Sequence, residues 1–312
     1  MATGRRNGLA ARALLGVLLC APVLAYETDP FQNRAVATAD AGTVLNREVN
    51  RTLRDLVEHW RGPASQARMV DAIYRRIGGL HWVDRLERWA MRSREVEKLP
   101  TPPHESVYAH QPLYAVRVAG LFGIGPSFRV AGVLIGSDKL GHFLSQGRKF
   151  WRRWQRSHDE AAAARQSAFT ERAIFGAATT GVYSNADLVA NYEGHRFYRS
   201  LFEDDIVPGK PAILVRSGAG WRIQREFDFA DHVNPWWDEA LNPNAYDRLL
   251  APSMRRRLHT FCPQVADAPT IWEVLPETDQ ALEARYAMLG LRDRRDWRMV
   301  SLCAAAWAPS SG

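Results

Sequence analysis

Two stretches of sequence decide the fold: Gly136-Ser-Asp-Lys-Leu-Gly-His-Phe143 and, some forty residues later, Ser184-Asn-Ala-Asp-Leu-Val-Ala-Asn-Tyr-Glu-Gly194. In each stretch two polar side chains lie four residues apart, and on a helix such a pair shares one face. Asp138 is paired with His142 in this way, and Asp187 with Asn191. We therefore predict two helices whose polar groups converge on a common point.

Helical periodicity dominates the first third of the chain. Apolar residues recur at intervals of three and four, which predicts helices over residues 44–60, 67–77 and 81–99. A proline-rich stretch, 100–112, then predicts an extended connector. Further helices are expected after residue 244. The chain is thus predicted to be mainly α with a small β element, an irregular α-helical globular domain.

The β element is expected in two places. Residues 128–135 have the composition of a strand that leads directly into the Asp138 helix, and residues 213–216 and 221–229 flank a Ser-Gly-Ala-Gly turn, which predicts a hairpin. Trp236 and Trp237 follow in a polar loop, where we expect them to anchor the core rather than to form a sugar platform.

The beginning of the chain is typical of a secretory signal. Three arginines precede a short apolar core at 13–19, and Val-Leu-Ala at 23–25 offers a cleavage site. We therefore expect residues 1–25 to be removed, and the mature protein to be exported to the periplasm or the cell envelope. The remaining chain is expected to divide into a helical region with its connector at 26–126, motif-bearing helices at 127–205, and a hairpin with C-terminal helices at 206–312, packed as one globular unit.

Cysteine usage agrees with export. Beyond the predicted signal peptide only Cys262 and Cys303 remain. An oxidising compartment favours a disulfide between them. Its role would be structural, because neither cysteine has a basic partner nearby in the sequence.

The net charge limits the choice of partner. It is +7 for the whole chain and falls to +4 once the three arginines of the signal peptide are removed. Arginine clusters at 152–153, 255–257 and 292–295 are expected to be solvated helix faces, with contact to an anionic envelope component or a membrane surface as the alternative. Nucleic acid is a poor candidate, because aromatic residues are not interleaved with these clusters. The sequence does not indicate an oligomeric state.

The side chains of the two motif stretches suit metal binding or proton transfer. Asp138, His142, Glu171 and Asp187 supply three carboxylates and one imidazole. Such an oxygen-rich set suits Mg²⁺ or Mn²⁺ better than a structural zinc site, although Zn²⁺ is also a candidate. Without a metal, His142 could act as a general base.

Three further residues complete the predicted site. Lys139 is expected to meet substrate charge, Asn191 to orient the catalytic groups, and His195 to extend the Asp187 stripe by one more turn. The chain contains no G-x-S-x-G elbow, phosphate loop, H-E-x-x-H helix or dinucleotide fingerprint, which disfavours several common enzyme classes.

The order Asp138-Lys139-x-x-His142, Glu171, then Asp187-x-x-x-Asn191-x-x-Gly194 resembles the VanZ-like family over about residues 136–197. In that family an Asp-Lys-x-x-His segment, a Glu and an Asp-x-x-x-Asn-x-x-Gly segment follow one another at similar intervals. The family's proteins span the membrane, whereas the matching segments here carry many charges. The resemblance implies a shared polar constellation near the cell envelope and does not imply a reaction.

Two functions follow from these observations. The first is an exported envelope protein that binds or hydrolyses an anionic substrate, such as a lipid-linked phosphate or a glycan, with a metal-assisted or histidine-based hydrolase as the enzyme class. The second is a non-enzymatic periplasmic binding or scaffold protein, in which the same residues form a structural polar network between two helices.

Overall fold

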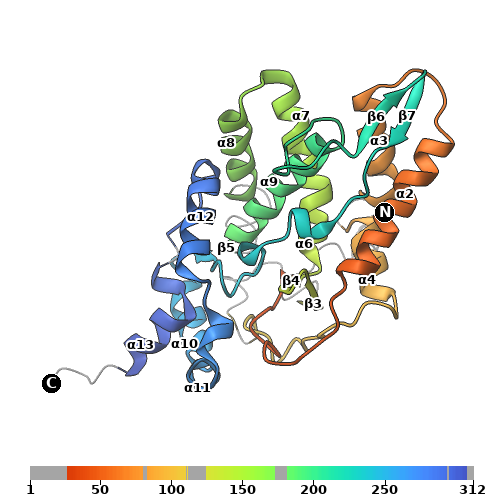
Figure 1. Cartoon of the computed structure of the whole chain (residues 1–312). Helices are drawn as coiled ribbons and strands as arrows, with labels where there is room; N and C mark the ends of the chain where they lie inside the picture. Colours follow the sequence, from red (N-terminus) through yellow and green to blue (C-terminus); the bar gives the residue numbers. More distant parts are fainter. Residues whose placement is uncertain are drawn as a thin grey trace, which may run out of the picture.

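The computed structural model describes residues 27–79, 83–109, 111, 124–172, 181–293 and 295–307. Within these residues the chain is mainly α with a few short two-stranded sheets, as the sequence predicts (Figure 1). The predicted signal peptide lies outside the described residues. None of the described helices is long and apolar enough to cross a membrane.

Two long helical segments occupy the centre of the molecule (Figure 1). The first runs without a break through α6 (Asp138–Gly141), a π-helical turn η1 (His142–Gln146) and α7 (Gly147–Ser157). The second is α9 (Asn185–Ser200), in which every residue except Arg199 is buried. Both helices are predicted by the sequence.

The N-terminal helices are α2 (Gly42–Glu58), α3 (Gln66–Ile77) and α4 (Arg85–Arg92). The first two confirm the predictions. The prediction for 81–99 is too long, because the backbone becomes extended at Ser93. In this extended segment the Lys98 ammonium donates hydrogen bonds to the carbonyl oxygens of Ser93 and Val96. Residues 81 and 82 lie outside the described residues.

The predicted single strand at 128–135 is wrong. The structure has two antiparallel strands, β3 (Ser127–Val130) and β4 (Val133–Gly136), which are joined by a two-residue turn. Ala131 and Gly132 both adopt positive φ angles, of 50° and 79°, as such tight hairpin turns require. The chain therefore folds back on itself just before the Asp138 helix begins.

The predicted hairpin is confirmed as β6 (Leu214–Ser217) paired with β7 (Gly220–Ile223), although β7 is shorter than the predicted second strand. Two further pairs join distant parts of the chain. Strand β1 (Glu27–Thr28) lies parallel to β2 (Ile124–Gly125), and β5 (Val182–Tyr183) lies antiparallel to β8 (Ala245–Tyr246). The first of these pairs brings Thr28 toward the Asp138 helix, and the second positions the start of α9.

Five more α-helices among the described residues lie on the side of the centre opposite α2, α3 and α4 (Figure 1): α8 (Glu160–Thr170), α10 (Ala251–His259), α11 (Cys262–Asp267), α12 (Pro276–Tyr286) and α13 (Met299–Trp307). Short 3-10 turns occur at 229–231, 235–237, 269–272, 287–289 and 295–297. The larger apolar cluster packs the N-terminal helices against α7 and α9, and includes the fully buried Trp236 and Trp237. These two tryptophans thus confirm the expected core role.

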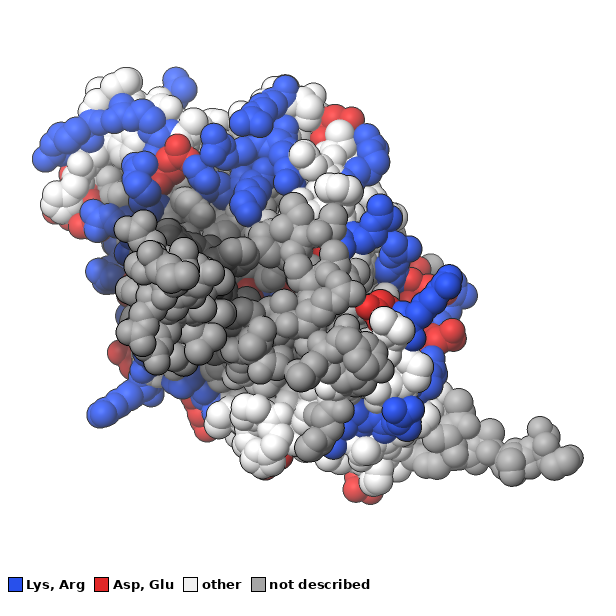
Figure 2. Space-filling view, turned by 180° about the vertical axis from the view of Figure 1, so that it is seen from behind, with Lys and Arg blue, Asp and Glu red and all other residues white. Residues whose placement is uncertain are grey.

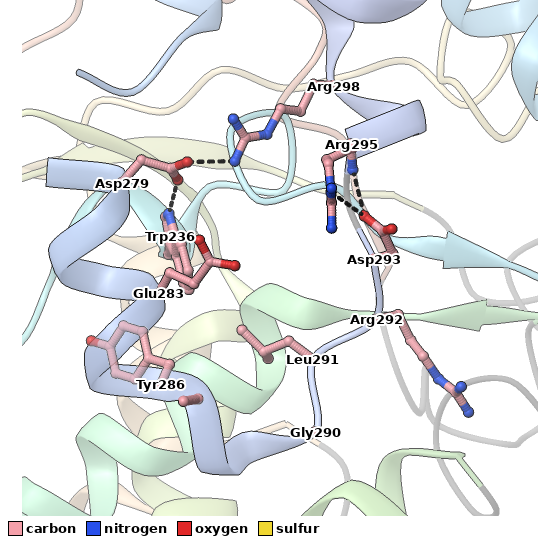
Figure 3. A pocket seen from close by; sticks show the side chains of 11 residues that line it. Trp236, Asp279, Glu283, Tyr286, Gly290, Leu291, Arg292, Asp293, Arg295 and Arg298 are labelled. Atoms are coloured by element: carbon pink, nitrogen blue, oxygen red, sulfur yellow. Dashed lines mark hydrogen bonds and ion pairs between the residues drawn. The ribbon is translucent and has the colours of Figure 1, made fainter. Parts of the chain in front are cut away.

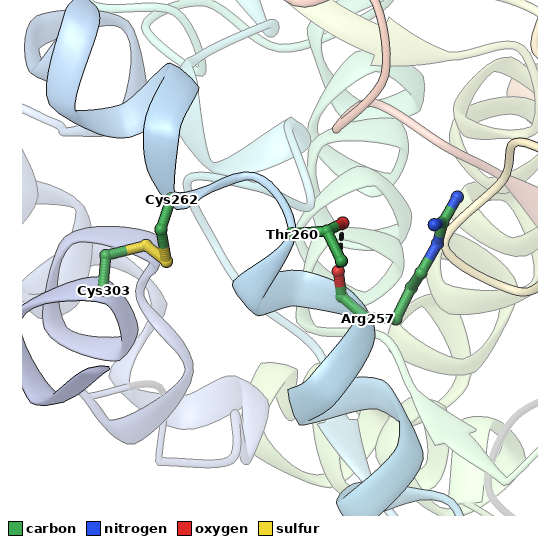
Figure 4. Close-up of a disulfide and its surroundings, with 4 residues drawn as sticks. All are labelled: Arg257, Thr260, Cys262 and Cys303. Atoms are coloured by element: carbon green, nitrogen blue, oxygen red, sulfur yellow. Dashed lines mark hydrogen bonds between the residues drawn. A yellow bond between two sulfur atoms is a disulfide. The ribbon is translucent and has the colours of Figure 1, made fainter. Parts of the chain in front are cut away.

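A second apolar cluster lies among α10, α11 and α13 and contains the disulfide between Cys262 and Cys303 (Figure 4). The sequence predicts this pair. The bridge joins the start of α11 to α13, and the two cysteines are buried. It therefore fixes the last described helix to the C-terminal cluster, away from the polar residues of the central helices.

Candidate functional site

The two motif helices cross with their backbones in contact. A Cβ atom on Gly194 would lie 1.9 Å from the carbonyl oxygen of Phe143, and one on Gly147 would lie 2.6 Å from the Cα of Gly194. No side chain larger than hydrogen fits at either position. This close crossing brings the polar residues of the first helix within hydrogen-bonding distance of those on α9.

The crossing coincides with the π-helical turn His142–Gln146. Single π turns inside α-helices are often found at functional sites, because they shift the side-chain register locally. Here the turn begins at His142. Tyr198 of α9 donates a hydrogen bond to the carbonyl oxygen of Leu144 in this turn at 3.0 Å, so the irregular backbone is held by the neighbouring helix.

A single buried ammonium lies at the centre of the polar cluster. Lys139 is fully buried, and its Nζ lies 2.7 Å from Asp138 Oδ2, 2.6 Å from Asp187 Oδ1 and 2.6 Å from Glu239 Oε1. Burial alone would lower the pKa of Lys139, but the three carboxylates outweigh it and hold the pKa well above its ordinary value. The lysine is therefore charged, and its three donors are all used by protein groups.

His142 shares the Asp187 carboxylate with this ammonium and contacts two residues of α9. Its Nε2 is 3.1 Å from Asp187 Oδ2, and its Nδ1 is 3.0 Å from Asn191 Oδ1. Asn191 Nδ2 donates to Ser167 Oγ at 3.3 Å, which leaves the amide oxygen as the acceptor for Nδ1–H. In this arrangement Nε2 faces a carboxylate oxygen, and the contact is favourable when a proton or a cation lies between the two atoms.

Asp187 is held in its charged form by the same neighbours. Burial would raise its pKa, but His142 and Lys139 outweigh this and lower the pKa below its ordinary value. Ser184, the N-cap of α9, accepts a hydrogen bond from the amide of Asp187. The carboxylate thus sits in the first turn of a capped helix, where the helix dipole also favours negative charge.

Glu239 is a member of the cluster that sequence reasoning missed. It follows the buried tryptophan pair, and it bonds Lys139, Ser184 Oγ at 3.3 Å and Asn244 Nδ2 at 2.9 Å. Burial raises its pKa to about 7, although Lys139 opposes this. The only signal in the sequence was an acidic pair beside two tryptophans, which gave no indication that the loop reaches Lys139.

Thr28 and Glu87 were also missed. Thr28 Oγ1 donates to Asp138 Oδ1 at 2.9 Å, and a Cβ atom on Gly136 would lie 2.0 Å from that hydroxyl. Glu87 is buried beside Gly141, and its pKa is well above the ordinary value because of burial and the nearby Asp138 and Asp84 carboxyls. Both come from segments far from the motifs in sequence.

Three atoms of the cluster are arranged as cation ligands. Asp138, His142 and Asp187 each offer one ligand atom, and all three atoms lie within 4.8 Å of one another. The side chains are 17%, 19% and 11% exposed, so the group is reachable from solvent, whereas Lys139 is not. One imidazole nitrogen and two carboxylate oxygens suit Mn²⁺, Mg²⁺ or a catalytic Zn²⁺. The second nitrogen of His142 bonds an amide oxygen, as in many metal-bound histidines.

The other predicted site residues lie differently. Glu171 is buried, and its Oε1 accepts a hydrogen bond from the amide of Ser184 at 3.5 Å, so it adjoins the cluster at the start of α9. His195 bonds Glu160 at 3.1 Å and stacks on Phe150. The His195 side chain therefore packs against α7 and α8 and does not join the predicted site. Lys139 contacts carboxylates in place of the expected substrate charge.

Two surface depressions lie apart from this cluster. One, of about 760 Å³, is lined mainly by α12 and the segment 290–298 (Figure 3). The other, of about 330 Å³, lies between α8, Tyr183 and residues 288–292. None of the three candidate ligands lines either depression.

Comparison with known proteins gives no match: no family model, curated protein or solved structure is similar to this chain.

Proposed function

We propose that Asp138, His142 and Asp187 bind a divalent cation, and that the protein is an exported envelope hydrolase acting on an anionic substrate such as a lipid-linked phosphate or a glycan. One observation carries the proposal. The Nε2 atom of His142 faces a carboxylate oxygen of Asp187 while the other ring nitrogen is directed at an amide oxygen.

Charge balance supports a cation at this position. One ammonium faces the carboxyl groups of Asp138, Asp187 and Glu239, so the buried cluster is negative overall while these groups are ionised. Uncompensated charge in a buried place is expensive. A divalent ion held by Asp138, His142 and Asp187 would supply the missing positive charge on the side that solvent can reach.

The residues divide the work of such a site in a simple way. Lys139 contacts Asp138 and Asp187 and holds both carboxyl groups in position. Asn191 fixes the ring of His142 so that Nε2 points toward Asp187. A bound divalent ion would polarise a phosphoryl or carbonyl oxygen and activate water. Without an ion, His142 could accept a proton from water beside Asp187.

The envelope location rests on the sequence and one feature of the fold. The predicted signal peptide, the disulfide and the resemblance to the VanZ-like family all favour export. Export to the cell envelope is therefore part of the proposal.

A structural network is the second candidate, and the complete burial of Lys139 favours it. A salt bridge of this depth can pin two helices together without any chemistry. This candidate differs from the first in what it expects of His142, which would then act only as a hydrogen-bonding link between η1 and α9.

The test compares purified wild-type protein with His142→Ala and Asp187→Asn, with Mn²⁺ present. Release of phosphate from a polyprenyl diphosphate and of reducing ends from cell-wall glycan are measured, and thermal unfolding is followed in parallel. His104→Ala, at an exposed histidine, is the matched control. A hydrolase predicts folded, inactive site variants and an active control. Wild-type protein that releases neither product, together with site variants that melt well below it, would establish the structural network instead.

A further inference from the structure

The smaller depression has an unusual lining. Its charged side chains are Arg165, Arg172 and Arg292. No Asp or Glu of the described part of the chain lines it. The lining is completed by two aromatic rings and by small or apolar residues: Phe169, Tyr183, Ala168, Met288, Leu289 and Gly290. A hollow of about 330 Å³ with this composition offers both positive charge and an apolar wall.

The neighbouring depression provides a direct contrast. It also carries three arginines, but Arg298 pairs with Asp279 and Arg295 with Asp293 (Figure 3). Arg295 and Arg298 are thus each paired with a carboxylate that lines the larger depression, and the third arginine, Arg292, lines both depressions. In Figure 3 the side chain of Arg292 points away from Asp279 and Arg298, consistent with its place in the lining of the smaller depression as well.

The arginines of the smaller depression have little compensation. Within the described residues, Arg172 and Arg292 form no ion pair, and Arg165 has only a distant one, 3.8 Å from the exposed Asp159. Arg292 instead lies over the Tyr183 ring, 5.3 Å from its centre, and the Tyr183 hydroxyl donates to the Gly290 carbonyl at 3.0 Å. The ring and its hydrogen bond therefore hold Arg292 at the edge of the hollow.

The apolar part of the lining is also exposed. Phe169 is 56% exposed, which is unusual for a large apolar side chain in this protein. Guanidinium groups bind phosphate through paired hydrogen bonds, and an exposed aromatic ring favours a ligand with an apolar part. Figure 2 shows Lys and Arg side chains over much of the described surface on one face, with fewer Asp and Glu. Such a surface attracts anions.

We propose that the depression lined by Arg165, Arg172 and Arg292 binds a phosphate monoester group attached to an apolar or ring-shaped portion. Arg172 and Arg292 bind the phosphate oxygens, and Phe169 contacts the apolar portion. This site is separate from the candidate cation site and stands on different residues. It therefore does not depend on the proposed hydrolase.

Calorimetry with phenyl phosphate and with inorganic phosphate tests the proposal on the whole chain. The double variant Arg172→Gln/Arg292→Gln is expected to bind phenyl phosphate at least tenfold more weakly than the wild type. Arg216→Gln/Arg256→Gln removes the same charge from exposed positions that line neither depression and is the matched control. Equal weakening in both double variants, or no binding by the wild type, overturns the proposal.

A second comparison tests the apolar wall. The wild type is expected to bind phenyl phosphate several-fold more tightly than inorganic phosphate, and Phe169→Ala is expected to remove that preference while it leaves inorganic phosphate binding unchanged. A wild type that binds both ligands equally would remove Phe169 from the site. Because these residues are exposed, circular dichroism is expected to show the same fold in every variant.

The source of the phosphate is distinguished with vesicles. Phosphatidylcholine vesicles with and without phosphatidic acid present or withhold a lipid phosphate monoester. Binding that requires phosphatidic acid and is lost in Arg172→Gln/Arg292→Gln identifies a lipid headgroup, whereas phenyl phosphate binding without vesicle binding identifies a soluble ligand. His142→Ala is expected to bind phenyl phosphate as the wild type does, so failure of the proposed cation site and failure of this site give different results.

Discussion

Helix α9 carries two buried ionic clusters that have opposite charge balance. At its N-terminal end, one ammonium, Lys139, faces three carboxyl groups, and part of the cluster is open to solvent. Two turns later one carboxylate, Glu193, faces two guanidinium groups, an imidazole and a tyrosine hydroxyl: Arg196, Arg285, His232 and Tyr286. Glu193 and His232 are both sealed from solvent.

The difference separates a structural cluster from a candidate site. Glu193 has more donors than it needs, and they come from α9, the loop at 232 and α12, so the contacts tie three segments together. The Lys139 cluster has fewer cations than carboxyl groups and an accessible edge at His142. Excess negative charge at an accessible edge indicates a place for a cation, whereas a satisfied and sealed cluster indicates a role in stability.

The largest loss of stability is expected when Lys139 is replaced. Lys139→Met removes the one cation that three buried carboxyl groups share, and breaking a buried ion pair on one side lowers the free energy of unfolding by about 3 to 5 kcal/mol. Urea denaturation at pH 8 measures this loss. The loss should shrink at pH 5, because Glu239, whose pKa is raised by burial to about 7, is then neutral. A variant as stable as the wild type at pH 8 would contradict the central place given to Lys139.

The second-largest loss of stability is expected at Gly194, where the two helices cross. Gly194→Ala places a methyl group 1.9 Å from a backbone oxygen of the other helix, so the two helices must separate. Such overpacking is expected to lower the free energy of unfolding by about 3 kcal/mol and to weaken the His142–Asn191 contact.

Gly220→Ala is the matched control for this change. A Cβ atom there meets only Trp60 at an ordinary 3.5 Å, and the φ angle is not positive. Its effect is expected to stay within about 0.5 kcal/mol. Equal effects of the two substitutions in thermal unfolding would show that the close crossing is not required.

The two histidines sharpen the contrast between the clusters. His232→Ala removes a fully buried ring that contacts Glu193 and packs on Phe143 and Phe227, and is expected to lower the free energy of unfolding by about 2 kcal/mol. His142→Ala removes a partly exposed ring, so its effect is expected to be below about 1 kcal/mol in metal-free buffer. Denaturation with a chelator present measures both. If His142→Ala is the more destabilising change, the Lys139 cluster is structural.

The last effect concerns the pH dependence of stability. The pKa of Glu239 is raised by burial from 4.5 to about 7, so the folded protein binds more protons than the unfolded chain between these pH values. Its contribution to stability is therefore complete below pH 4.5 and is lost as the pH rises through 7. Glu239→Gln should flatten the stability profile in this range by up to about 3 kcal/mol, which is what a pKa raised from 4.5 to about 7 corresponds to. A profile of unchanged slope, measured by urea denaturation at several pH values, would contradict this.

Much of the central region could be predicted from local patterns. The four-residue spacing of Asp138 with His142 and of Asp187 with Asn191 is a property of one helix, and the sequence shows it directly. The disulfide follows from having two cysteines to pair. The convergence of the two pairs was also expected, although its cause, the contact between Gly147 and Gly194, is visible only in three dimensions.

The missed residues share one physical reason. Glu239, Thr28 and Glu87 reach the cluster from loops, a two-residue strand and a short helix that are far away in sequence, and no periodic pattern marks them. His195 shows the reverse error. It lies one turn beyond Asn191 on the same helix, but drift around the helix turns it to Phe150 and Glu160. The burial of Lys139 likewise depends on partners from three separate segments.

Titration with Mn²⁺ followed by electron paramagnetic resonance tests the central claim most directly. Wild-type protein and the exposed-site control His104→Ala are predicted to bind one Mn²⁺ ion per chain, and His142→Ala and Asp187→Asn to bind it at least tenfold more weakly. Wild-type protein that leaves Mn²⁺ free in solution, or a His142→Ala variant that binds it as tightly as the wild type, would contradict the claim that Asp138, His142 and Asp187 form a cation site.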